Sequence, residues 1–468
     1  MEHHCSSAES EGISDFSGEG LELHEDSVIK SNGTVETSRK KRLWDVLVKF
    51  FVDDFSFAFF VPVMGTGMAS SLLYNFPYPG KWLEVCGIIL WGIAIFFFFV
   101  ALASLSVVFV KDYKRLVELH MDISEAPFMG CLAMGYGTLL NMLFYLTRTS
   151  WIVGVWVLWW IEVVLSLYTF AIVFYVVALA KNRNRDNHLP PKDLNATLLL
   201  PVVTLSVAAA SGGLFVSDLP STRLKIITLV VCFIIWANAI LMGLIIITIY
   251  FWKLIVYKIP STSLVFSSFL PIGILGQGGF GILLFGHNIF ELIMDNHSRV
   301  PISNYLSYIP PKYFESIGTE TISYVIGSVI LFSSALAAMF ITAFGHYITF
   351  VAIISCLSKI RPFTKHYDEE FSYAPHNAFF FKRQFAGFIK FNRNFWAMTF
   401  PLGTMALSNT EFWRVFNGME AFRVIGTIYA VTVIFIVLGC IIGIIYEIGQ
   451  SLRYVFVGEK LPQTNFKV

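Results

Sequence analysis

Charged residues are scarce in this chain. Asp, Glu, Lys and Arg make up 14% of its 468 residues, whereas 56% are hydrophobic. A typical soluble domain has about 25% charged residues. With a mean hydropathy of +0.67, the chain has too little polar surface to keep a fold of this length in water. The composition therefore excludes a water-soluble protein and predicts an integral membrane protein.

The sequence also lacks the motifs of several chemistries. No G-x-x-x-x-G-K-[ST] loop is present, so nothing indicates ATP hydrolysis. The 10 His residues show no H-E-x-x-H or similar metal-ligand spacing, and the 6 Cys residues include no C-x-x-C pair. Most of these cysteines fall in or beside apolar segments, where a thiol packs as a small apolar group. We predict no metal, no cofactor, no enzymatic activity and no nucleic-acid partner.

Apolar segments long enough to cross a bilayer as helices recur along the chain. Their lengths are typical of helices and not of the short alternating strands of a barrel. Ten such segments are predicted: 55–75, 86–109, 127–147, 151–180, 196–217, 225–256, 262–286, 322–356, 394–413 and 423–448. The sequence thus predicts an all-α transmembrane domain over residues 45–450. The polar, Gly/Ser-rich segment 1–44 is expected to be a disordered tail, and 451–468 a short tail.

The distribution of basic residues predicts the orientation, because cytoplasmic loops retain Lys and Arg. An N-terminus inside the cell places most of the 33 Lys and Arg residues on the cytoplasmic side. Both termini are therefore predicted to be cytoplasmic. Only an Asn on the outer side can carry a glycan. Of the sequons at Asn32, Asn195 and Asn296, this orientation exposes only Asn296 outside, which makes Asn296 the glycosylation candidate.

Proline occurs in alternate segments only. Of 17 prolines, those inside predicted spans all fall in odd-numbered ones: Pro62, Pro127, Pro201, Pro271 and Pro401. This alternation predicts one helical hairpin used five times. Pro weakens an α-helix, and a broken helix at membrane depth is tolerated only when it is buried in protein or lines a cavity. We predict five kinked inner helices around a central pore, enclosed by five outer helices. The alternative is the general frequency of Pro in membrane helices.

The inner helices carry neutral polar groups and, between their ends, no Lys, Arg, Asp or Glu. The absence of fixed charge argues against a proton pump of the carboxylate type and against tight cation binding. Freed backbone N–H groups and hydroxyls can still favour anions through their dipoles. The candidate pore-lining or kink residues are Pro62, Gly65, Thr66, Gly67, Pro127, Pro201, Pro271, Gly276, Gln277, Gly278, Thr399, Pro401, Gly403 and Thr404.

Two further side chains stand out by their position. Phe400 directly precedes a proline of an inner helix, where it is either a hydrophobic constriction that blocks conduction or an ordinary packed aromatic. Glu162, in WWIEVVL, is a carboxylate deep in an outer span. An unpaired charge there is costly. We therefore expect a structural partner for Glu162, with His346 and Arg423 as candidates.

Several stretches resemble one known family: VMGTGMASSLLYNFPYPGKW (63–82), LPIGILGQGGFGILL (270–284), FWAMTFPLGTMALSN (395–409) and AFRVIGTIY (421–429). They are similar to the tellurite-resistance and dicarboxylate transporter (TDT) family. That family includes the bacterial TehA channel homologue, the plant guard-cell slow anion channel and the yeast malate permease. The resemblance covers residues 45–450 and is strongest to the fungal subgroup.

The resemblance implies ten helices in five hairpins around a central pore, assembled as a homotrimer in the plasma membrane. It also implies that a Phe beside the proline of the ninth helix closes the pore, and Phe400 matches that position. In the similar fungal subgroup the substrate is sulfite or bisulfite, exported for detoxification. A malate or dicarboxylate permease of the same fold stays open as an alternative. So does a membrane receptor or scaffold.

Overall fold

The computed structural model describes residues 41–44, 48, 49, 53, 55–180, 194–296, 319–359, 391–416 and 418–457. The described residues form helices and connecting turns, without a β-strand. The predicted disordered tail lies outside them except for its last four residues. Asn32, the connection 361–390 and residues 458–468 also lie outside the described residues.

Nine helical segments of the described chain are long and apolar enough to cross a membrane. They correspond to nine of the ten predicted segments. The helices are α2 (Val61–Tyr74), α3 (Lys81–Lys111), α5 (Met129–Thr147), α6 (Ile152–Tyr168), α7 (Leu200–Phe215), α8 (Thr222–Tyr257), α9 (Leu270–Asn296), α11 (Thr319–Leu357) and α14 (Glu420–Val457). π-helical turns extend α6 to Leu179.

The remaining predicted segment, 394–413, forms α13 (Thr399–Val415). This helix has 17 residues and contains Glu411 and Arg414, and it is more polar than the nine. Two other boundaries also differ from the sequence prediction. The short helix α4 (Tyr113–Met121) occupies a predicted loop, and α14 continues past residue 450 to Val457.

The long helices fall into two classes by burial. In the spans that contain α2, α5, α7 and α9, between 61 and 94% of the residues in the most apolar window are buried. In those that contain α3, α6, α8, α11 and α14, the share is only 22 to 39%. Residues 399–406 and 408–412 of α13 are also buried. The exposed side chains of the second class are large and apolar, such as Phe96 and Phe99 of α3. Such surfaces suit contact with lipid.

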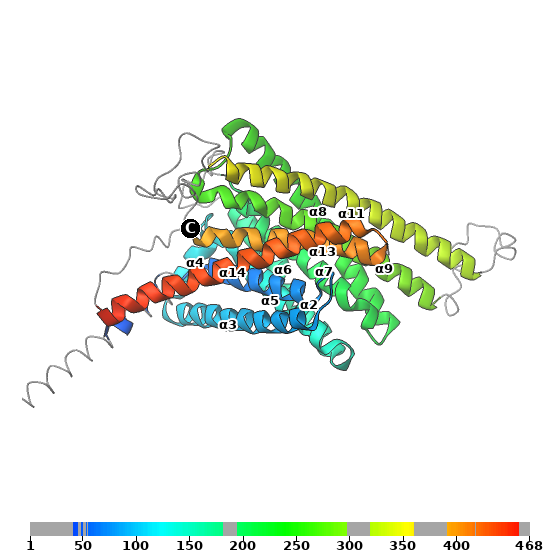
Figure 1. Cartoon of the computed structure of the whole chain (residues 1–468), viewed down its shortest axis with the longest axis horizontal. Helices are drawn as coiled ribbons and strands as arrows, with labels where there is room; N and C mark the ends of the chain where they lie inside the picture. The colour runs from blue at the N-terminus through cyan, green and yellow to red at the C-terminus, as the bar shows by residue number, and fades with distance from the viewer. Residues whose placement is uncertain are drawn as a thin grey trace, which may run out of the picture.

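The buried helices contact one another in a closed circuit. Helix α2 packs against α5, α5 against α7, α7 against α9, α9 against α13, and α13 against α2. Each one also packs against the exposed helix that follows it in the chain, as α2 does against α3 and α9 against α11. Figure 1 shows the long helices as one bundle, with α3 and α11 on opposite sides of it.

A 3₁₀ turn precedes each buried α-helix. These turns are Phe57–Phe60, Ala126–Phe128, Ala196–Leu199, Thr262–Phe269 and Arg393–Met398. A 3₁₀ segment is narrower than an α-helix and commonly occurs at α-helix ends. Every buried helix therefore changes its winding near one end of the bundle.

The five prolines lie at these transitions. Pro62, Pro201 and Pro271 are the second residues of α2, α7 and α9, Pro401 is the third residue of α13, and Pro127 lies in the turn before α5. The first N–H groups of an α-helix have no intrahelical acceptor, so Pro is tolerated there. The prolines thus begin the α-helices. The bends expected within the spans are 3₁₀-to-α transitions, and the α-helical segments after them continue without a proline.

Candidate functional site

Phe400 lies on the side of α13 that faces the inside of the circuit. Next to it on the helix, Gly403 contacts Met68 of α2, and Thr404 contacts Gly276 of α9. Viewed along the axis of α13, Phe400 points between the directions of Gly403 and Thr404. It therefore points between α2 and α9. Its side chain is 2% exposed, and its Cδ1 is 3.9 Å from the position of a Cβ added to Gly273 of α9. The ring therefore fills space that a residue without a side chain leaves on α9.

Several predicted lining residues form contacts between neighbouring buried helices. A Cβ added at Gly65 would overlap with Thr399 Oγ1, one at Gly67 would overlap with Thr138 Oγ1, and one at Gly276 would overlap with Thr404 Oγ1. Glycine allows such close approach of two helices in a membrane. These glycines hold the circuit together by receiving a threonine from the next helix.

The threonine hydroxyls donate to carbonyls of their own helices. Thr404 Oγ1 donates to Pro401 O at 2.7 Å, and Thr399 Oγ1 donates to Trp396 O at 2.8 Å. In α7, Thr204 Oγ1 donates to Pro201 O at 2.8 Å. After Pro201 and Pro401, the threonine three residues later thus donates a hydrogen bond to the proline carbonyl. An anion would have to replace these bonds to use the same donors.

Other buried polar atoms have no hydrogen-bond partner within the described part of the chain: Thr66 Oγ1, Gln277 Oε1, Trp396 Nε1 and Asn409 Oδ1. Unpaired buried polar groups are unusual and costly. Gln277 is 2% exposed. Gly278, the next residue, faces Ile240 of α8 and Ile341 of α11, so Gly278 is directed at outer helices and away from the inside of the circuit.

Trp396 is not among the residues predicted from the sequence. It lies one turn before Phe400, is 2% exposed, and packs against Gly65 of α2. Its indole N–H is a buried donor without a partner among the described residues. The sequence FWAMTF could have indicated Trp396 as a neighbour of Phe400, because residues four apart lie near the same face of a helix.

Residues 54–445 match the voltage-dependent anion channel family. The chain belongs to this family. It is 36% identical to the sulfite efflux pump of Candida albicans over 429 residues, which are 90% of this chain and 81% of that protein. It is 29% identical to the sulfite efflux pump of Saccharomyces cerevisiae, over 84% of this chain and 88% of that protein. A third sulfite efflux pump, from Arthroderma benhamiae, is 26% identical over 85% of this chain and 90% of that protein.

In this member of the voltage-dependent anion channel family, Glu162 has a partner other than the expected ones. Its Oε1 accepts a hydrogen bond from Ser211 Oγ of α7 at 3.1 Å, and its Oε2 has no partner in the described chain. His346 instead contacts the Tyr429 hydroxyl at 3.0 Å, and the Arg423 guanidinium lies 4.0 Å from the Tyr78 ring centroid. The expectation of His346 or Arg423 as partner is therefore wrong.

Glu162 reaches the circuit although it belongs to an exposed helix. Its carboxyl group is fully buried and lies against Gly137 of α5, where an added Cβ would overlap with Oε1. The absence of a side chain at Gly137 leaves room for the carboxyl group between α6, α5 and α7. At this position a helix of the exposed class thus reaches between two buried helices.

Ion pairs lie near the ends of α9 and α13. Arg414 is 3.6 Å from Glu411, and His287 is 3.3 Å from Glu291. No group of three or more His, Cys, Asp and Glu side chains suited to a metal ion occurs in the described residues. In the described part of this family member, the charged side chains of the circuit helices thus lie near the helix ends, and Glu162 reaches the circuit from α6.

At the opposite end of the circuit, Glu125 precedes the 3₁₀ turn of α5. Its carboxylate accepts a hydrogen bond from Ser56 Oγ, just before the 3₁₀ turn of α2. Burial raises the pKa of the Glu125 carboxyl, and the Ser56 hydrogen bond opposes this effect. The pair joins the beginnings of two adjacent buried helices.

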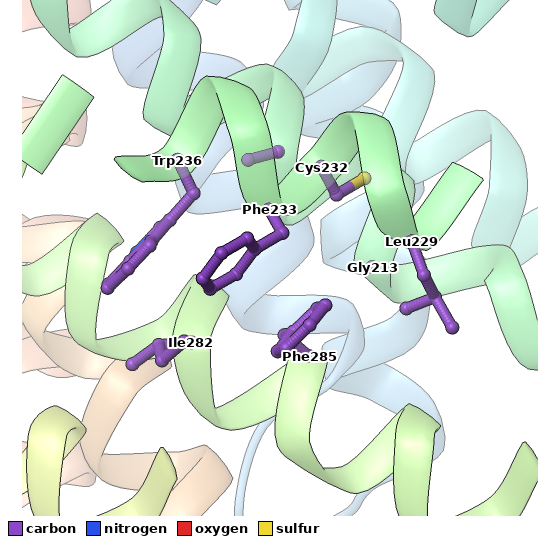
Figure 2. A pocket seen from close by; sticks show the side chains of 9 residues that line it. Gly213, Leu229, Cys232, Phe233, Trp236, Ile282 and Phe285 are labelled. Atoms are coloured by element: carbon purple, nitrogen blue, oxygen red, sulfur yellow. The ribbon is translucent and has the colours of Figure 1, made fainter. Parts of the chain in front are cut away.

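A small cleft opens between α7, α8 and α9 (Figure 2). Its walls include Leu229, Cys232, Trp236 and the stacked rings of Phe233 and Phe285, whose centroids are 4.9 Å apart. The cleft has a volume of about 10 Å³, which is roughly enough for one water molecule. Its lining is mainly apolar and includes the outer helix α8. We therefore assign it no part in the site around Phe400.

Proposed function

We propose that the chain exports sulfite or bisulfite through the inside of the circuit formed by α2, α5, α7, α9 and α13. The observation that carries this proposal is the closed circuit of buried helices with Phe400 directed toward its interior. The names of the relatives as sulfite efflux pumps support the substrate. Membership of the voltage-dependent anion channel family supports an anion as the transported species.

We further propose ten spans, arranged as five hairpins around a central pore, with α13 as the ninth. Helix α13 packs against α2, α9 and α14, so protein surrounds it on several sides and it needs little apolar surface of its own. Its 17 residues span about 26 Å at 1.5 Å per residue. The preceding 3₁₀ turn adds enough length to cross the hydrocarbon core of about 30 Å.

Export would be passive. An anion that leaves a cell with a negative interior gains about 2.3 kcal/mol per charge for each 100 mV. A pore without strong binding charges favours rapid release of the ion. Both features suit detoxification by efflux without ATP.

The proposed setting is the plasma membrane, with both termini cytoplasmic and a homotrimer as the assembly. The basic residues support the orientation, and the resemblance to the TDT family supports the trimer. Asn296, the last residue of α9, is the proposed glycan acceptor on the outer side. In this setting, lipid covers the exposed apolar faces of α3, α6, α8, α11 and α14.

The first test is Phe400→Ala in proteoliposomes, with sulfite, malate, nitrate and chloride flux measured separately. Removing the ring opens the interior of the circuit, so sulfite flux should rise severalfold over wild type. Phe412→Ala serves as the control: Phe412 is on the same helix but stacks on Phe422 of α14 at 4.9 Å. This control should keep the wild-type flux.

Both proteins must elute as folded species in gel filtration. A Phe400→Ala flux equal to that of wild type would remove Phe400 from the gate. Malate flux above sulfite flux would favour the dicarboxylate permease. The absence of flux for all four anions would favour a receptor or scaffold.

A further inference from the structure

Helix periodicity places Leu407 and Phe280 beyond the contact between Phe400 and Gly273. Seven residues of an α-helix turn by about 20° less than two full turns and advance by roughly 10 Å. Leu407 of α13 therefore lies on the same face as Phe400. Phe280 of α9 likewise lies on the same face as Gly273. A Cβ added at Gly273 would be in contact with the Phe400 ring.

Phe280 and Leu407 belong to one hydrophobic cluster. Phe280 forms its centre with Ala210 and Leu284, and Leu214 and Leu407 pack against it. These residues come from α7, α9 and α13, which are three consecutive helices of the circuit. Phe280 is 2% exposed. Its fully buried residues are distinct from those of the larger cluster that contains Phe400, and Leu214 and Leu407 pack against both.

A polar layer lies between the two apolar ones. Thr404 follows Phe400 by about one turn and contacts Gly276, which precedes Phe280 by about one turn. Gln277 is at the same level, with its Oε1 unpaired in the described chain. Along the circuit, the order is thus Phe400, then Thr404 with Gln277, then Phe280 with Leu407.

We propose that Phe280 and Leu407 form a second hydrophobic constriction in series with Phe400. This inference rests on the proposed function, since it assumes that the anion crosses the circuit. A narrow apolar ring excludes water and therefore ions. With two such rings, the rise in flux from opening Phe400 alone is limited by the ring that remains. The anion would pause between them, beside Thr404 and Gln277.

Accessibility of a cysteine between the constrictions tests the proposal without relying on transport. In the full chain, Thr404→Cys places a thiol at the level of the polar layer. A charged, membrane-impermeant thiol reagent should not reach this thiol from either side. Adding Phe280→Ala should allow labelling only from the side at which α9 ends, and adding Phe400→Ala only from the side at which α9 begins. The wild-type chain measures labelling of the native cysteines.

The matched control for Phe280→Ala is Phe285→Ala. Phe285 lies on the same helix but faces Phe233 of α8 (Figure 2). It should leave Thr404→Cys unlabelled. The proposal is overturned if Phe280→Ala does not permit labelling from the end of α9, or if Thr404→Cys reacts from that side while Phe280 is intact.

Flux then separates this inference from the proposed function. The double variant Phe280→Ala, Phe400→Ala should carry sulfite about tenfold faster than either single variant, because the resistances of barriers in series add and the intact constriction limits the flux of each single variant. A double variant no faster than Phe400→Ala overturns the second constriction. If labelling follows the expected pattern while no anion crosses in any variant, the constriction stands and the sulfite-export function fails.

Discussion

Replacing Gly276 by alanine should destabilise the protein by about 1–3 kcal/mol, the usual cost of overpacking. A Cβ at this position would overlap with Thr404 Oγ1 and would be 2.8 Å from the backbone N of Met405. The hydroxyl could rotate, but the backbone atom cannot move unless α13 moves with it. Because α13 also contacts α2 and α14, a shift would disturb both of these contacts.

Thermal unfolding in detergent, followed by the fraction that stays monodisperse, measures this effect. Gly92→Ala is the matched control, since a Cβ at Gly92 of α3 meets nothing within 4 Å. The control should be neutral or slightly stabilising, because alanine favours a helix over glycine by about 1 kcal/mol. Equal unfolding temperatures for the two variants would show that α9 and α13 are less tightly packed than the structure indicates.

The sequence was sufficient to predict the nine long apolar helices and which of them are buried. Segments without a proline, such as 86–109, form the helices with exposed apolar faces, which suit a bilayer because lipid accepts bulky apolar side chains. Segments with a proline near one end and many small residues became the buried ones, because close packing selects small residues. Helix α13 is the informative case. It is too polar for a simple hydropathy criterion, yet its proline pattern placed it with α2, α5, α7 and α9.

The rotation of each helix could not be predicted, since it depends on which helix lies opposite. Thr399 and Thr404 were expected to line a pore; the sequence did not indicate that they also contact glycines of adjacent helices. Gly276 and Gly278 are two residues apart and face different neighbours, α13 for the first and α8 and α11 for the second. The proline repeat in the sequence predicts that these residues lie on inner helices, but it does not predict which helix each of them contacts.

The partner of Glu162 was unpredictable for a related reason. Ser211 is 49 residues away on another helix, and a serine hydroxyl is not an obvious partner for a buried carboxyl group. The structural cue is Gly137, whose missing side chain admits the carboxyl group. In the sequence this glycine is one of several in MGYG and similar runs, and nothing marks it as a contact for a carboxyl group.

Gly137→Ala should therefore destabilise the protein through Glu162. The added methyl would overlap with Glu162 Oε1 and would be 2.8 Å from its Cδ. The carboxyl group would have to leave its bond to Ser211, and a buried polar group that loses its partner costs about 1–3 kcal/mol. Glu162→Ala alone should also destabilise the chain, because it leaves a cavity and an unpaired Ser211 hydroxyl.

A double-mutant cycle distinguishes this contact from general disturbance of the helices. In the double variant Gly137→Ala, Glu162→Ala, the methyl at 137 occupies part of the space that the carboxyl group vacates. The combined loss of stability should then be smaller than the sum of the single losses, by about 0.5–3 kcal/mol, the range for residues in contact. Pairing Gly137→Ala with Glu447→Ala on α14 is the control and should be additive, since Glu447 pairs with Arg393. Additive losses in both pairs would contradict the placement of Glu162 against α5. A coupling confined to the first pair would establish that an outer helix reaches between two members of the circuit.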